Sequence, residues 1–350
     1  MWKTVYKYIL LLFGFYAILN VQAQSDDTYY RLAREKLTNM LSGKDSLDLQ
    51  RAVYWVEDAW YNNRLNESLF IEQIKQYADF CRIISESDWI TYCGEDEQSV
   101  KKQAAVFAFI TDSIPIQLGD SLLWHLPFKY NYEDFAGEKD WSNMFVSTLM
   151  QTRKGNCHSM PLLYKMIMNQ LGEKCWLALA PNHMYVKART RQSGWYNIEL
   201  TTGDHPTDAW IMASGYIHLD AVRSGIYMDT LSALQEIALC LVDLAQGYQR
   251  KYPGNDGTFV WECCKTALKY YPDYINAMLI QADLMTKHYL AIPDKGSQTA
   301  RTLKEEMNRA YTRIHESGYR KMPEKMYKEW LASLSRCNKK NTSRRDPNYH

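Results

Sequence analysis

The fold of this chain is decided by nine residues, 153–161, with the sequence RKGNCHSMP. The glycine and asparagine in this stretch favour a turn, and an apolar stripe at helical spacing follows until Gly172. Pro161 falls in the first turn of the predicted helix, where its missing N–H is least costly. The sequence therefore predicts a helix with Cys157 at its start.

A cysteine in this position has a chemical advantage. Its sulfur would face unpaired backbone N–H groups and the positive end of the helix dipole, and both favour thiolate over thiol. A cysteine at a helix start is more often structural, so a nearby base is needed before Cys157 becomes a nucleophile. The neighbouring His158 is expected to point away from the sulfur and to have a packing or supporting role.

Two alternating segments downstream, 183–189 and 195–200, predict an antiparallel hairpin. If the hairpin is centred on Arg191, His183 lies opposite Glu199 with Cβ atoms about 5 Å apart. A carboxylate beside an imidazole orients a general base, whereas a slip of one residue would send the two to opposite faces. A thiol, an imidazole and a carboxylate can therefore meet, provided that the helix start packs against this sheet.

In order and spacing these residues resemble the core of the transglutaminase-like superfamily, whose papain-like fold carries a Cys, His, Asp triad. The resemblance extends over about a third of the chain, through GNC at the helix start, NHMYV in the first strand and WYNIELT in the second. It implies Cys157 as nucleophile, His183 as base, and Glu199 where the family most often has Asp. Gln151 stands at the spacing of the oxyanion-hole glutamine of papain-type enzymes.

The resemblance implies an α+β fold, with the cysteine helix packed on a small antiparallel sheet over residues 96–230. Residues 24–95 carry apolar residues at helical spacing and predict an N-terminal helical region. Residues 231–337 are again helical and resemble a degenerate tetratricopeptide repeat around Tyr271-Pro272. This region is expected either to hold a partner protein or only to cover the core. A polar tail at 338–350 is predicted to be disordered.

The flanking elements are predicted from apolar periodicity and turn residues. Residues 114–140 are expected to form an irregular, aromatic-rich loop, and residues 142–153 a short helix before the cysteine turn. Ser46 is the expected cap of the second helix. The remaining helices are expected at 30–41, 47–61, 68–84, 98–110, 259–271, 274–288, 301–317 and 325–334.

Residues 1–23 have the anatomy of an export signal, with lysines, a short apolar run and the small-residue site Val21-Gln22-Ala23. The apolar run is too short to be a good membrane span, although an uncleaved anchor stays open as the alternative. The mature chain is therefore expected to be soluble in a periplasmic or extracellular space, with no membrane span.

Charge and cysteine usage narrow the function classes. The formal net charge is +1, and no basic run is interleaved with aromatic residues, which disfavours a nucleic-acid partner. The eight cysteines do not form a dense framework, and only Cys81 and Cys93 suggest a disulfide by proximity. No CxxC motif indicates structural zinc, and no cofactor is expected.

Three functions stay open. The first is an exported cysteine enzyme that acts on an amide bond of a peptide or protein substrate through an acyl-thioester, as a hydrolase or by transfer to an amine. The second is an inactive binding or scaffold module of the same fold. The third is a metal site built from Cys157, His183 and Glu199, for which no fourth ligand is evident. Turn chemistry explains the rival acids and bases of the next loop, which are Asp204, His205 and Asp208.

Overall fold

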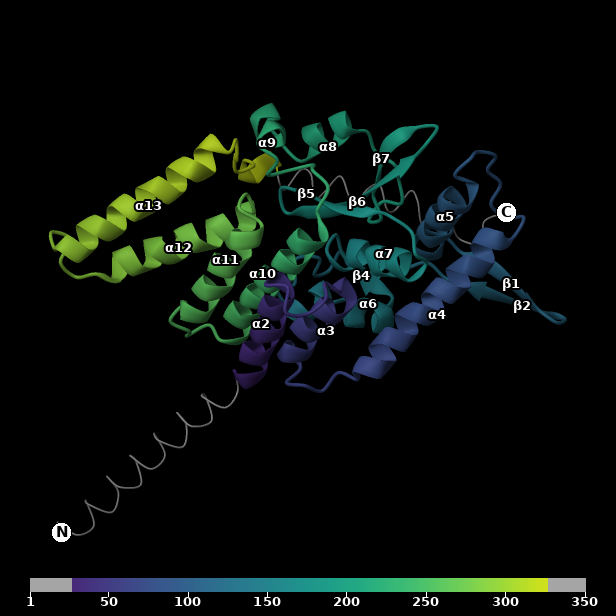
Figure 1. Cartoon of the computed structure of the whole chain (residues 1–350), viewed down its shortest axis with the longest axis horizontal. Helices are drawn as coiled ribbons and strands as arrows, with labels where there is room; N and C mark the ends of the chain where they lie inside the picture. Colours follow the sequence, from purple (N-terminus) through teal and green to yellow (C-terminus); the bar gives the residue numbers. More distant parts are fainter. Residues whose placement is uncertain (1–26, 327–350) are drawn as a thin grey trace, which may run out of the picture.

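The computed structural model describes residues 27–326, and its α+β architecture confirms the predicted fold class (Figure 1). The export signal expected at 1–23 and the tail expected at 338–350 lie outside these residues, as does most of the helix expected at 325–334. Along the described stretch, every helix is either too short or too polar to cross a bilayer.

Four N-terminal helices form as the apolar periodicity predicts, with ends displaced by at most two residues. The second helix is capped by Asp48, which accepts the N–H of Arg51 at 3.1 Å, so the predicted cap Ser46 is wrong. Asn66 caps the third helix in the same way. These elements are α2 (Thr28–Leu41), α3 (Leu49–Trp60), α4 (Glu67–Glu86) and α5 (Glu97–Thr111).

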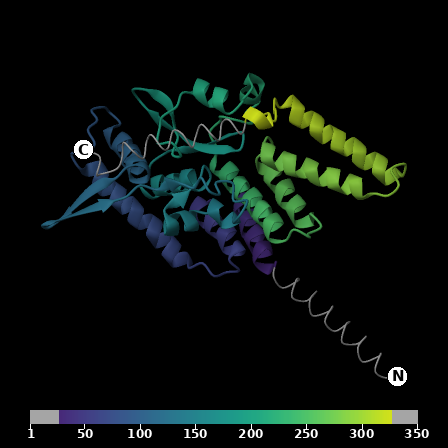
Figure 2. The ribbon, with the colours of Figure 1, turned by 180° about the vertical axis from the view of Figure 1, so that it is seen from behind.

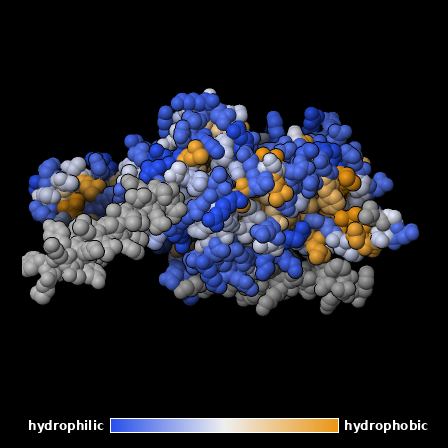
Figure 3. All heavy atoms as spheres, turned by 90° about the horizontal axis from the view of Figure 1, so that it is seen from below, coloured by the Kyte–Doolittle hydropathy of each residue, from blue (hydrophilic) through white to orange (hydrophobic). Residues whose placement is uncertain are grey.

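The irregular loop predicted over 114–140 is wrong in its first half. An antiparallel hairpin forms there from β1 (Ile114–Leu118) and β2 (Ser121–His125), with Gly119 in the left-handed region at the turn. β2 exposes most of its residues on both faces, so the sequence lacks the alternation that predicts a strand. Apolar side chains of this hairpin contribute to the orange surface towards the right-hand end of Figure 3.

The cysteine turn is followed by a helix and three antiparallel strands. The helix packs against the first two strands. The strand order is β5-β6-β7, and the short β3 and β4 pair in parallel beside the turn. From residue 129 to residue 198 the elements before and after the cysteine turn are β3 (Lys129–Tyr130), η1 (Trp141–Met144), α6 (Val146–Thr152), β4 (Lys154–Gly155), α7 (Ser159–Gln170), β5 (Trp176–Ala180), β6 (His183–Thr190) and β7 (Gly194–Ile198).

The register of the predicted hairpin is wrong by two residues. Lys187 pairs with Asn197 rather than with Trp195, because Gly194 adopts a left-handed φ of 71° and moves the turn centre one residue along the chain. A two-residue shift keeps every side chain on its face, since successive side chains alternate between faces. His183 and Glu199 therefore stay on one face of the sheet.

The C-terminal helices complete the molecule. α10 packs against α11 and also against α2 and α3, so helices far apart in the sequence lie side by side (Figures 1 and 2). A capping box of Ser232 and Gln235 fixes the start of α10. These elements are α8 (Asp208–Ser214), α9 (Leu219–Arg223), α10 (Ala233–Lys251), α11 (Thr258–Tyr270), α12 (Ile275–Ala291) and α13 (Gln298–Glu316).

The suggested disulfide is not formed. Cys81 is a free thiol buried on α4, and Cys93 is a free thiol in an exposed loop. Proximity along the chain is a poor guide here because the two side chains belong to different environments. The buried cysteines behave as small apolar residues of the core. Of the two described thiols that are not buried, Cys93 and Cys157, Cys157 lines the cleft described below.

Candidate active site

The backbone of the cysteine turn is fixed from two sides. A Cβ added at Gly155 would lie 2.6 Å from Cδ1 of Leu149 and 2.9 Å from Oγ of Ser159, so only glycine fits. The carbonyl of Gly155 accepts the N–H of Asn131 at 2.7 Å, which ties the turn to β3. Cys157 therefore lies between β4 and α7, on a backbone segment that these contacts hold in place.

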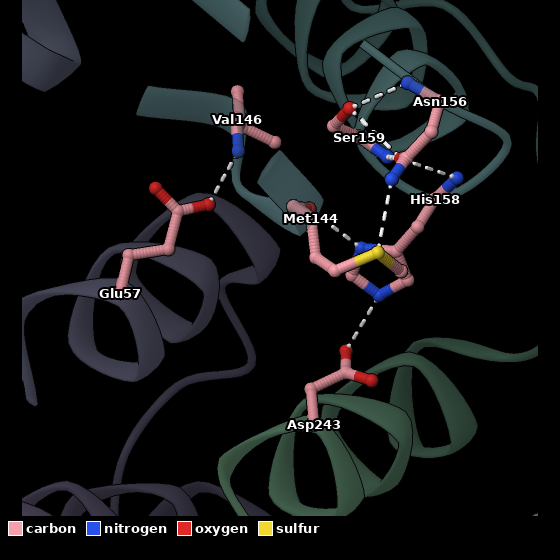
Figure 4. Close-up of polar contacts among 7 residues, drawn as sticks. All are labelled: Glu57, Met144, Val146, Asn156, His158, Ser159 and Asp243. Atoms are coloured by element: carbon pink, nitrogen blue, oxygen red, sulfur yellow. Dashed lines mark hydrogen bonds and ion pairs between the residues drawn. The ribbon is translucent and has the colours of Figure 1, made fainter. Parts of the chain in front are cut away.

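Asn156 caps the turn, and this corrects the predicted helix start. Its fully buried side chain accepts the N–H groups of His158 at 3.0 Å and Ser159 at 2.9 Å, as Figure 4 shows. α7 begins at Ser159, two residues after Cys157. The amides that were expected to face the sulfur are thus occupied by an amide oxygen. A thiolate at Cys157 needs its main stabilisation from elsewhere.

His183 begins β6, directly after a turn in which Asn182 takes a left-handed φ of 53°. Asparagine tolerates this conformation better than most residues. Nε2 of His183 lies 2.5 Å from Oε2 of Glu199 and donates to it. The other oxygen of Glu199 accepts from the backbone N–H and the hydroxyl of Thr201 at 3.0 and 2.6 Å. The buried carboxylate is therefore held in place while it orients the ring.

The charges of this pair favour the ionised forms. Burial alone lowers the pKa of His183, but the Glu199 carboxylate and hydrogen bonding to Cys157 raise that pKa well above its usual value. Burial raises the pKa of Glu199, yet the cation of His183 and the bonds from Thr201 outweigh burial and lower it. The site thus favours an imidazolium beside a carboxylate.

Cys157 completes the constellation. Its thiol donates to the carbonyl oxygen of Asn182 at 3.8 Å, and Cys157 and His183 line the same cleft. Because Nε2 of His183 serves Glu199, Nδ1 is the nitrogen that can take the thiol proton. The structure thus brings together all three predicted site residues, although they belong to a turn, a strand and a loop.

The thiol opens into a cleft of about 280 Å³. One wall comes from the cysteine turn and the start of β6, and apolar side chains of Phe135 and Trp141 lie beside them. The C-terminal helices also line the cleft, with Leu239, Gln246 and Arg250 on α10 and Ile275 and Asn276 on α12. A segment remote in sequence therefore forms part of the site.

Several weaker predictions are resolved by position. Gln151 is exposed on α6 and does not line the cleft, so it is not placed to serve as an oxyanion donor. His205 packs against Phe107, and burial lowers its pKa. Asp208 accepts from Asn197 at 2.8 Å. None of these three side chains competes with the constellation at the cleft.

One imidazole–carboxylate pair at the cleft escaped sequence reasoning. His158 was expected to point away from Cys157, yet both line the cleft. Nδ1 of His158 lies 3.0 Å from the carbonyl oxygen of Met144, and Nε2 lies 3.0 Å from Oδ2 of Asp243 (Figure 4). Burial lowers the pKa of His158, but the charge of Asp243 dominates and raises it to about 9. The partners are 85 residues apart, so no local pattern could have predicted them.

Neither a metal-ligand group among the described residues nor a similar known protein indicates what the site does. Across residues 27–326, no three side chains of His, Cys, Asp or Glu are grouped as metal ligands, so the metal alternative gains no support. Comparison with protein-family models, curated proteins and solved structures gives no match. Function is therefore argued from the geometry of the site.

Proposed function

We propose that this chain is an exported, transglutaminase-like cysteine enzyme that forms an acyl-thioester from an amide or peptide bond. Cys157 is the nucleophile, His183 the base and Glu199 the residue that orients the base. The observation that carries the proposal is that Cys157 and His183 line one cleft, with the sulfur 3.8 Å from the carbonyl oxygen of the adjacent Asn182, while Glu199 holds His183 at 2.5 Å. The packing of α7 on β5 and β6 supports a papain-like core, and the helix pairs after α10 support the tetratricopeptide-like region.

The reaction follows from these positions. In the reactive form the proton of Cys157 has moved to Nδ1 of His183, and the resulting thiolate attacks the substrate carbonyl. The C–N bond then breaks, and the imidazolium returns that proton to the leaving amine. Water or a second amine attacks the thioester, which releases a carboxylate or a new amide and restores the thiol. The backbone N–H of Cys157 is the proposed oxyanion donor.

The glutamate in the third position fits this strand register. If the observed pairing is extended past β7, Tyr185 stands opposite Glu199, so His183 and Glu199 are diagonal neighbours. Diagonal positions are about 7 to 8 Å apart, further than directly opposed ones. The additional methylene of glutamate spans that separation and reaches Nε2 at 2.5 Å. The departure from the family's aspartate therefore supports an intact triad rather than a lost one.

An active ester tests the proposal directly. Incubation with p-nitrophenyl acetate is expected to release a burst of p-nitrophenol and to add one acetyl group to Cys157, detected by peptide mass spectrometry. Cys157→Ser should abolish the burst, and an added primary amine should receive the acetyl group if the enzyme is a transferase. A folded protein that shows neither burst nor acetylation would instead favour the inactive binding module.

A further inference from the structure

His158 is held as a cation by its two partners. The carbonyl oxygen of Met144 can only accept a hydrogen bond, and so can the ionised carboxylate of Asp243. Both ring nitrogens of His158 must therefore carry protons to satisfy these contacts, as only an imidazolium does. His158 cannot act as a base without giving up one of the two bonds.

This cation and the sulfur belong to the same cleft. Cys157 and His158 are consecutive, and both line the cleft. Because Asn156 occupies the amides at the start of α7, the helix end contributes little to a negative charge on Cys157. A fixed positive charge on the adjacent His158 can stabilise a thiolate at Cys157 instead.

We propose that the His158 imidazolium, held by Asp243 from α10, stabilises the Cys157 thiolate, and that Asp243 is a positioning residue for this cation. The inference rests on the proposed function, because it takes Cys157 as the nucleophile. It also assigns α10 a task beyond packing, since the carboxylate that sets the charge at the thiol belongs to the C-terminal helical region.

The other titratable groups around His158 leave Asp243 as its direct counter-ion. From α3, the buried Glu57 shares a small cavity with His158, but its oxygens accept the N–H group of Val146 at 2.6 Å (Figure 4) and that of Ser147 at 2.9 Å. From α10, Cys240 lines the same cavity, and burial raises the pKa of its thiol. From α12, Tyr274 lines the cleft, and burial raises its pKa as well.

The experiment is the pH dependence of alkylation at Cys157 in the whole chain. Iodoacetamide labelling of Cys157 is followed by peptide mass spectrometry, so that the other cysteines do not interfere. The variants are Asp243→Asn, Asp243→Glu and the matched control Asp283→Asn, which removes an exposed carboxylate paired with Lys287 on α12.

We expect wild-type Cys157 to react with a midpoint below the free-thiol value of about 8.5. Asp243→Asn should raise this midpoint by about one pH unit, which makes labelling about tenfold slower below the midpoint. Asp243→Glu should restore part of the shift, and Asp283→Asn should leave the profile unchanged.

The outcomes separate the two proposals. A low wild-type midpoint that Asp243→Asn does not move would overturn the role of His158 and leave the enzyme proposal standing. A shifted midpoint without acylation by the active ester would overturn the enzyme proposal alone. An ordinary midpoint in the wild-type protein would overturn both.

A second measurement avoids the risk that Asp243→Asn unfolds. In wild-type protein labelled with ¹⁵N-histidine, long-range ¹H–¹⁵N spectra distinguish imidazolium from either neutral tautomer. We expect both nitrogens of His158 to be protonated at pH 7.5, where a free histidine with a pKa of about 6.5 is neutral. A neutral ring at that pH would overturn the inference.

Discussion

Two imidazole–carboxylate pairs flank the same thiol and differ in what their second ring nitrogen does. In the pair of His183 and Glu199, one nitrogen donates to the carboxylate, and the other is the one we assign to proton exchange with Cys157. In the pair of His158 and Asp243, the second nitrogen donates to a backbone carbonyl of η1. The same two chemical groups therefore give a ring that can exchange a proton and a ring that keeps both.

The difference teaches that an acceptor on each side of an imidazole fixes its charge, whereas an acceptor on one side only fixes its orientation. The first arrangement serves electrostatic stabilisation and the second serves proton transfer. Variants that replace one partner at a time test whether the two histidines have these different roles.

The largest effect is expected from the proton carrier. His183→Ala should slow acylation of Cys157 by p-nitrophenyl acetate about a thousandfold at pH 7, because general base catalysis is worth about 10² to 10⁴. His158→Gln should slow it only about tenfold, because it removes a charge and not a proton acceptor. Stopped-flow measurement of the burst checks both rates. Equal losses in the two variants would contradict the assigned roles.

The orienting carboxylate comes next. Glu199→Gln should slow acylation about a hundredfold, because the neutral amide no longer raises the pKa of His183 or supports its cation. Glu199→Asp should also lose activity, since the shorter side chain no longer spans the diagonal. The burst assay measures both variants. Full activity of the aspartate variant would show that the reach of the side chain does not matter.

A smaller effect is expected on stability. The pKa of His158 is raised from 6.5 to about 9, so its contribution is complete below about pH 6.5 and is lost as the pH rises through about 9. Asp243→Asn should therefore lower the free energy of unfolding by about 2 kcal/mol at pH 6 and by less at pH 9.5. Urea unfolding at both pH values provides the measurement. A difference that grows with pH has the wrong sign for this account.

The smallest effect is expected at Glu57. Burial raises its pKa from 4.5 to about 7, so the folded state binds the extra proton and wild-type stability falls as the pH rises through that window. Glu57→Gln removes this titration, so its stability relative to wild type should rise by up to about 1 kcal/mol between pH 5 and 8. Urea unfolding again tests this. A constant difference would mean that Glu57 does not titrate there.

Much of the local structure was predictable. Apolar periodicity and turn residues predicted the N-terminal helices, α7 and the β6–β7 hairpin, because these signals lie within one or two turns of the chain. The β1–β2 hairpin was missed because β2 is exposed on both faces and shows no alternation. The register error had a similar origin, since the position of Gly194 in the turn was decisive.

The candidate site likewise has a part that local sequence signals predict and a part that they do not. By itself the sequence determined that Cys157 follows a glycine-rich turn and that His183 and Glu199 share one face of a hairpin, because alternation survives a two-residue slip. Only the tertiary structure decided that Asn156 occupies the amides at the helix start and that Asp243 of α10 reaches His158. Contacts across 85 residues depend on how helices pack, and no periodicity in the chain encodes the charge that such packing places beside a thiol.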